Sequence, residues 1–157
     1  MKVLVEYTDE VGTSFDADFF TRVAKETLLR CPLPNLSHRE EITLNTVAVS
    51  SEKIQELNAT YRGKEAVTDI LSFGEYPDTQ TLEAASEQKL FLGELFFCQD
   101  FIAASAEEDN IALEHEMVYV FSHGVLHLLG YDHSDEMFVL QDEVTALLTQ
   151  EAHTHTV

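Results

Sequence analysis

The spacing of three histidines constrains this chain more than any other feature of its sequence. His123 and His127 are four residues apart, Gly130 follows, and His133 comes soon after it, in the run HGVLHLLGYDH. On a helix, residues four apart lie on one face with Cβ atoms about 5–6 Å apart, so both imidazoles can reach one point. A glycine can end that helix in a left-handed turn that brings His133 back to the same point. The pattern predicts a helix, a tight turn and a metal centre.

Three histidine ligands leave one coordination position of a zinc ion open. Catalytic zinc sites keep such a position for water, whereas structural sites are closed by four protein ligands. The ion lowers the pKa of a bound water toward about 7, which a hydrolytic zinc site requires. We therefore expect one catalytic zinc per chain, held by His123, His127 and His133. Nickel and copper also accept imidazole, so the spacing leaves the native metal open.

The residue after the first histidine argues against a protease. The spacing equals that of the metzincin proteases, H-E-x-x-H-x-x-G-x-x-H, in which the glutamate is the general base. Gly124 stands at that position here. The pattern therefore favours a hydrolase of another kind.

Length and composition indicate one soluble domain. With 157 residues, 45% of them hydrophobic, the chain is long enough for one core, which we expect over residues 1–151, followed by a disordered tail at 152–157. Cys31 and Cys98 form no C-x-x-C pair, which excludes a disulfide framework and a cysteine zinc ribbon. No apolar run approaches the roughly 20 residues of a membrane helix, and the first residues lack a secretory signal. A cytoplasmic location is predicted.

The net charge restricts the partners. With 29 acidic residues against 9 Lys plus Arg, the formal charge is −20, which repels polyanions over most of the surface. Contact with a nucleic acid would therefore depend on a local basic spot or on a metal ion.

Hydrophobic periodicity predicts the order of the elements. A period of two indicates strands, and spacings of three and four indicate helices. Strands are expected at 2–7, 42–49, 69–73 and 91–98, and helices at 16–30, 51–63, 100–106, 111–129 and 135–151. Asp16, and either Ser50 or Ser51, are expected to cap helices, while the polar stretch 75–89 is expected to be a surface loop. This order predicts an α+β fold with a small mixed four-stranded sheet packed against helices.

Two motifs resemble the YbeY family of bacterial metal-dependent endoribonucleases, also called rRNA maturation factors. The first is HGVLHLLGYDH, and the second is LNATYRGKEAVTDILSFGEYP at 57–77, similar to the family's L-N-x-x-Y-R-G-K-x-x-x-T-D-V-L-S-F-P. The LGEL of residues 92–95 also fits the family's short strand. The chain departs at Val67 and Gly74, where the family usually has proline; both are expected in loops.

The resemblance implies a zincin-like single domain and single-strand-specific cleavage of RNA. It implies a role in 16S rRNA 3′-end maturation and ribosome quality control, with the 16S rRNA precursor and small-subunit ribosomal proteins as partners. It assigns zinc to His123, His127 and His133, and it places the family's important arginine at Arg62. We assign Arg62 and His123 to catalysis. Oligomeric state, cleavage position and the general acid and base stay open.

The basic residues of the second motif suit an RNA substrate. A planar guanidinium binds two phosphate oxygens at once, so Arg62 suits a phosphodiester, and Lys64 would hold the RNA backbone electrostatically. Without the resemblance, a surface ion pair is the simpler interpretation of Arg62. Asp132 is expected to orient an imidazole or cap the turn. Asp69 and Ser72 are left outside the predicted site, because turns and caps commonly use both residue types.

Two alternatives follow from the same residues. The first is a zinc hydrolase of a non-RNA substrate. Loss of RNA cleavage in Arg62→Ala, with the metal content intact, would argue against it. The second is a non-catalytic zinc-containing ribosome-assembly adaptor, in which a fourth protein ligand would close the zinc site.

Overall fold

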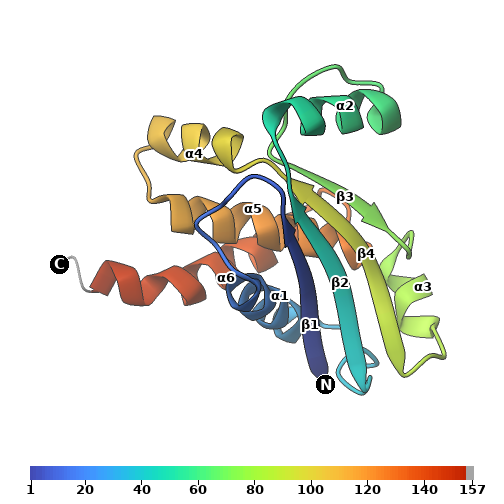
Figure 1. Cartoon of the computed structure of the whole chain (residues 1–157). Coiled ribbons are helices and arrows are strands. Elements are labelled where there is room, and N and C mark those ends of the chain that lie inside the picture. The colour runs from blue at the N-terminus through green and yellow to red at the C-terminus, as the bar shows by residue number, and fades with distance from the viewer. Residues whose placement is uncertain (155–157) are drawn as a thin grey trace.

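The chain forms an α+β fold with six helices and four strands within residues 1–154, which the computed structural model describes (Figure 1). The strands are β1 Lys2–Asp9, β2 Glu41–Ala48, β3 Ile70–Gly74 and β4 Lys89–Phe97. The helices are α1 Ala17–Arg30, α2 Ser51–Arg62, α3 Thr79–Ala84, α4 Gln99–Glu108, α5 Leu113–Leu128 and α6 Asp135–Thr154. The predicted fold class is confirmed. No helix in the described part is both long enough and apolar enough to cross a membrane.

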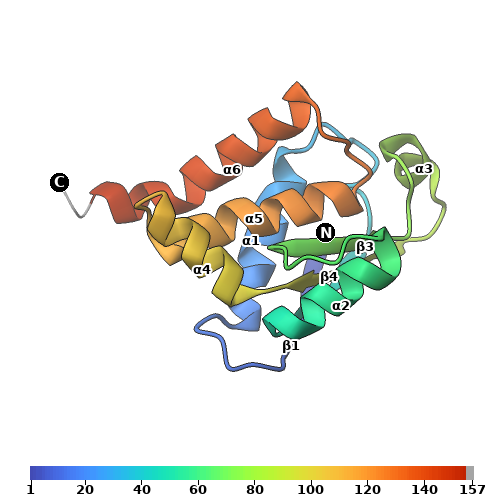
Figure 2. The same ribbon diagram turned by 90° about the horizontal axis from the view of Figure 1, so that it is seen from above.

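The four strands form one mixed sheet in the order β1-β2-β4-β3. Neighbours β1, β2 and β4 are parallel, and β3 runs antiparallel to β4 at the edge. Helices α1 and α5 pack against one face, and α6 packs on both of them. Helix α2 lies on the opposite side, so that β3 runs between α2 and α5 (Figure 2). This arrangement produces two helical walls facing each other across β3.

The core fixes α5 against the sheet. Phe20 of α1 touches the ring of Phe97 on β4, with centroids 5.3 Å apart, and that of Phe121 on α5, at 4.7 Å. All three side chains are fully buried. Burying a side chain of this size contributes about 1.5–3 kcal/mol, so this contact ties three elements together at the middle of α5, just before the histidines. The site therefore sits on a rigid support.

Local signals in the sequence locate the helix ends. The Asp16 carboxylate accepts a hydrogen bond from the Phe19 N–H at 2.9 Å, and the Ser50 hydroxyl accepts one from the Lys53 N–H at 3.1 Å. At the end of α2, Gly63 adopts φ +67°, a left-handed conformation suited to glycine. The predicted caps are confirmed, with Ser50 rather than Ser51 as the cap of α2.

One helix was missed and one runs longer than predicted, while the other boundaries differ from the prediction by one or two residues. The loop expected at 75–89 contains α3, which Asp78 caps by accepting a hydrogen bond from the Thr81 N–H at 2.7 Å. This helix has six residues, of which only Leu82 is buried. Because one buried residue cannot establish a spacing of three or four, the sequence shows no helical period here. Helix α6 runs to Thr154, beyond the predicted end at 151, and residues 155–157 of the predicted tail lie outside the described residues.

Candidate metal centre

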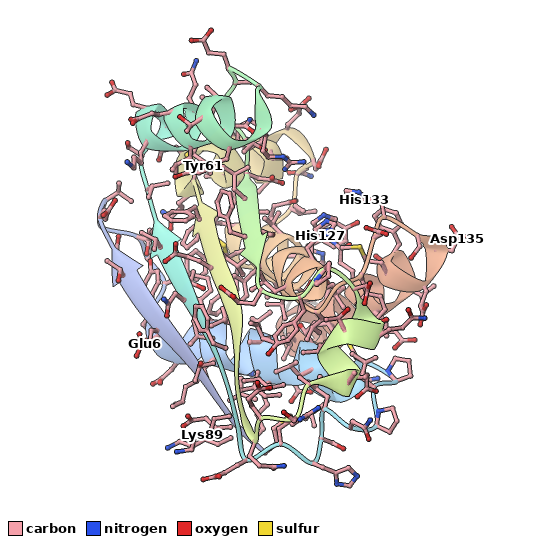
Figure 3. The ribbon with its side chains drawn as sticks, turned by 90° about the vertical axis from the view of Figure 1, so that its right-hand side faces the viewer. Glu6, Tyr61, Lys89, His127, His133 and Asp135 are labelled. Carbon is pink, nitrogen blue, oxygen red and sulfur yellow. The ribbon has the colours of Figure 1, made fainter. Side chains whose placement is uncertain are left out.

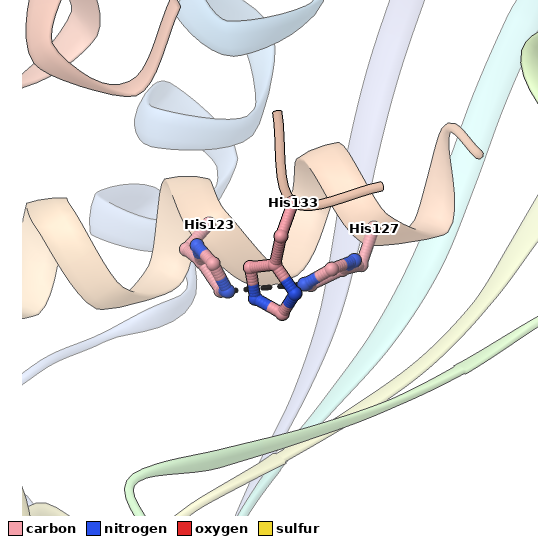
Figure 4. Close-up of side chains that lie close together, drawn as sticks. All are labelled: His123, His127 and His133. Carbon is pink, nitrogen blue, oxygen red and sulfur yellow. Dashed lines mark hydrogen bonds between the residues drawn. The ribbon is translucent and has the colours of Figure 1, made fainter. Parts of the chain in front are cut away.

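The end of α5 and the turn after it bring three histidines together. His123 and His127 project from the last turns of the helix, and their Nε2 atoms lie 3.0 Å apart. His133 joins them from the following turn, and one ring nitrogen from each histidine lies within 4.8 Å of the others (Figure 4). The ring of His133 is 4.7 Å from that of His127, centroid to centroid. The predicted convergence of the three side chains is present.

Gly130 makes this turn possible for two reasons. Its φ is +96°, in the region that favours glycine. A Cβ at this position would also lie 2.3 Å from the carbonyl carbon of Asp78, the residue that precedes α3. The short helix that sequence analysis missed therefore presses directly on the turn that carries His133.

Hydrogen bonds fix which nitrogen of each α5 imidazole faces the centre. The Gln141 amide nitrogen donates to the Tyr119 carbonyl at 3.0 Å, so its oxygen, 3.2 Å from His123 Nδ1, accepts from that nitrogen. His127 Nδ1 lies 3.0 Å from the Tyr131 carbonyl, which can only accept. Both Nδ1 atoms therefore carry the proton, and both Nε2 atoms keep a free lone pair.

These lone pairs fit a divalent metal. Two lone pairs that face each other at 3.0 Å repel unless a cation lies between them. Tetrahedral zinc with Zn–N bonds of about 2.0–2.1 Å holds its nitrogens about 3.3 Å apart, close to the observed separation. Metal-binding histidines also donate their second N–H to an amide or carbonyl oxygen, as both of these do. The donor set suits Zn²⁺ and other imidazole-binding metals.

The electrostatics keep the two imidazoles neutral. Burial lowers the pKa of His123 below its usual value, and the nearby His133 ring lowers it further. Burial also lowers the pKa of His127, with contributions from His123 and from the positive charge of Arg62. Neutral imidazole is the form that binds metal, so the environment favours binding down to a lower pH than an exposed pair would allow.

Gly124, the position of the metzincin glutamate, faces the sheet. A Cβ there would lie 2.8 Å from Ile70 Cδ1 and 3.1 Å from Leu95 Cδ2. Any longer side chain at this position must displace the packing of α5 on β3 and β4. The absence of a glutamate is therefore also a packing requirement of this fold.

The histidines line a cleft of about 580 Å³ whose opposite wall comes from α2 and β3. Arg62, the last residue of α2, lies in this wall beside Tyr61, and Asp69 and Ser72 also line it. In Figure 3, Tyr61 lies on the α2 side of β3, while His127 and His133 lie on the α5 side. Arg62 and the three histidines are thus brought to one cavity.

The other residues considered in the sequence analysis fall partly inside and partly outside the cleft. Asp69 and Ser72, which were left outside the predicted site, line the cleft, whereas Lys64 and Asp132 are not among the described lining residues. The imidazoles of His123 and His127 are oriented by Gln141 and by the Tyr131 backbone rather than by Asp132. Gln141 was missed. The sequence feature that could have revealed Gln141 is its place as a polar residue on the apolar face of the last predicted helix. The side chain is 1% exposed in the structure.

Comparisons with known proteins agree with the motifs. A family profile described as Endoribonuclease YbeY matches residues 7–149. The Endoribonuclease YbeY of Bacillus subtilis is 32% identical over 151 residues, covering 92% of this chain and 94% of the relative. That of Oenococcus oeni is 35% identical over 143 residues, covering 87% and 90%. The solution structure of TM1509 from Thermotoga maritima matches with a TM-score of 0.62 and 24% identity, covering 97% of this chain and 93% of that one. This last likeness supports the fold alone.

Proposed function

This chain belongs to the YbeY endoribonuclease family, hydrolases that act on RNA, and we propose that it cleaves single-stranded RNA with one zinc ion held by His123, His127 and His133. The observation that carries the proposal is the pair of Nε2 atoms of His123 and His127, 3.0 Å apart, in the same cleft as Arg62. A bound metal would supply Lewis acidity toward a phosphoryl oxygen and lower the pKa of a water.

The chain's own residues have separate tasks in this proposal. His123, placed by Gln141, and His127, placed by the Tyr131 carbonyl, present neutral nitrogens to the ion. Arg62, across the cleft, binds the phosphate and stabilises the negative charge that grows on its oxygens during hydrolysis. Arg62 and His123 are therefore the proposed catalytic residues. Arg62 would contact the substrate phosphate, and His123 would bind the metal ion.

The wider role follows from the family alone. We propose that the substrate is the 16S rRNA precursor, that the activity serves 3′-end maturation and ribosome quality control, and that small-subunit ribosomal proteins assist docking to so acidic a protein. We also propose a cytoplasmic location and a single catalytic domain over residues 1–151.

The alternatives receive less support from the site. The metal-binding group among the described residues has three members, which leaves a coordination position open, as a catalytic zinc requires and a structural zinc does not. The guanidinium in the same cleft matches a phosphodiester better than an uncharged substrate.

Metal analysis together with RNA cleavage tests the proposal. The wild type is compared with a variant that carries alanine at His123, His127 and His133, both purified without added metal and both lacking His153 and His155, which by sequence could bind metal adventitiously. We expect one equivalent of zinc and cleavage of single-stranded RNA in the first, and neither in the second. A folded wild type without metal, or a zinc-loaded one that leaves single-stranded RNA intact, would contradict the proposal.

A further inference from the structure

Tyr61 is an aromatic side chain that the fold leaves in solvent at the mouth of the cleft. It is 66% exposed, the largest fraction among the exposed large hydrophobic side chains of the described residues. It also lines the cleft that contains the histidines. Exposure forgoes the stabilisation that burial of an aromatic ring provides, so the packing of the core does not account for its position.

The ring is nevertheless held in place. Tyr61 makes an edge-to-face contact with Phe73 of β3, with centroids 5.2 Å apart and planes at 70°. Phe73 in turn makes an edge-to-face contact with Phe96 of β4 at 5.8 Å. Aromatic pairs prefer this geometry, so the row of three rings supports Tyr61 from the sheet side and leaves much of its surface to solvent. The ring is thus both ordered and accessible.

Its position relates it to the reacting phosphate. Tyr61 immediately precedes Arg62 at the end of α2, and both line the wall opposite the histidines (Figure 3). An RNA strand with a phosphate between Arg62 and the histidines would run along this wall. A base attached next to that phosphate would then lie beside the Tyr61 ring.

The cleft offers few basic side chains to such a strand. The chain has a net charge of −20, and Arg62 is the one Lys or Arg side chain among the described residues that line the cleft. Stacking of a base on an aromatic ring needs no positive charge, and it is available to an unpaired base whose faces are free. We propose that Tyr61 is a stacking platform for one base of the substrate next to the cleaved phosphodiester, an assignment that rests on the function proposed above.

The direct test combines substitutions with RNA lacking single bases. Zinc-loaded wild type, Tyr61→Ala and Tyr61→Phe are mixed with short single-stranded RNAs that carry one abasic nucleotide at each position in turn. We expect Tyr61→Ala to weaken binding to intact RNA about 10-fold, by stopped-flow anisotropy read before cleavage, and to raise KM more than it lowers kcat. Tyr61→Phe should retain wild-type binding, because the ring and not the hydroxyl stacks.

The abasic series locates the contact. At one position next to the cleavage site, the missing base should cost the wild type as much as Tyr61→Ala costs, and should cost Tyr61→Ala nothing further. Phe101→Ala serves as the matched control, because Phe101 is a 41% exposed aromatic on a helix, α4, and is not among the lining residues of this cleft. It should leave binding unchanged.

Salt separates stacking from displacement of the neighbouring Arg62. Binding of both proteins should weaken as salt rises, because phosphate contacts release counterions. The ratio of their dissociation constants should stay constant, since stacking carries no such dependence. A ratio that shrinks with salt would mean that Tyr61→Ala acts through Arg62, and would overturn the assignment.

Two further outcomes would also overturn it. These are binding by Tyr61→Ala within twofold of the wild type, and additive effects of Tyr61→Ala and the missing base at every position. A zinc-loaded wild type that neither binds nor cleaves single-stranded RNA would instead refute the proposed function itself, which distinguishes the two failures.

Discussion

The α5 wall of the cleft holds two half-buried imidazoles by hydrogen bonds, whereas the α2 wall leaves its side chains exposed to solvent. His123 and His127 are half-buried, and each has its Nδ1 bonded, to Gln141 and to a backbone carbonyl. Tyr61 and Arg62 are exposed at the end of α2. Metal binding requires nitrogens fixed to a fraction of an ångström, whereas binding of an RNA strand requires side chains that the strand can reach from solvent. The comparison indicates that one wall is organised for metal and the other for substrate.

The largest expected effect separates the two walls. Arg62→Ala should lower kcat/KM for RNA cleavage by about 10²–10³, the usual loss when one group that stabilises transition-state charge is removed, while zinc content stays that of the wild type. Arg62→Lys should not restore the rate, because an ammonium cannot bind two oxygens in a planar fork. His127→Ala should lose metal and activity together. Loss of zinc from Arg62→Ala would show that the walls do not act separately.

A smaller loss is expected from the support of the metal wall. Gln141→Leu should weaken zinc affinity about 10–100-fold, because His123 loses the partner that fixes its tautomer and orientation. Competition with a chelator measures this. The control is Thr145→Val. Thr145 is a buried polar residue of the same helix, and its hydroxyl donates to the main-chain carbonyl of Gln141, not to an imidazole. Equal loss in both variants would mean that general damage to α6, and not the contact with His123, lowers the affinity.

The turn that carries His133 should be sensitive in stability. Gly130→Ala should reduce the free energy of unfolding by at least about 2 kcal/mol, since it combines an unfavourable φ with a close approach to the backbone at Asp78. Gly12→Ala is the matched control: Gly12 has φ +80° but no atom within 4 Å of an added Cβ, so it should cost about 1 kcal/mol. Urea titration compares them. Equal costs would remove the contact with Asp78 from the explanation.

The smallest expected effect is on pH dependence in the metal-free protein. The pKa values of His123 and His127 are lowered in the folded state, so below about pH 6.5, the unperturbed value, the unfolded chain binds more protons. The free energy of unfolding should therefore fall as the pH falls from about 6.5 toward the folded pKa values, and level off below them. A variant with glutamine at both positions should lose less stability between pH 7.5 and pH 5 in chelator. Parallel curves would show that the two imidazoles are not shielded as the structure indicates.

Prediction from sequence succeeded where short-range chemistry decides the structure. The alternation of Ile42 and Leu44 identified β2, and Asp16 and Gly63 marked helix ends through hydrogen bonds and backbone angles that neighbouring residues determine. It failed at α3, where six residues bury one leucine and show no period. It also missed Gln141, because nothing local to residue 141 reveals that His123, eighteen positions earlier, will lie beside it.

The order of residues along the chain is enough to predict that two imidazoles share a helix face, that a glycine turn brings back a third, and that Gly124 replaces a protease's base. These follow from the pitch of a helix and from the backbone freedom of glycine. The packing of the folded chain was needed to show which nitrogens face inward, that α3 presses on the turn at Gly130, and that Tyr61 and Arg62 lie across β3 from the histidines. Those facts depend on contacts between segments distant along the chain, which form only when the sheet brings α2, α5 and α6 together.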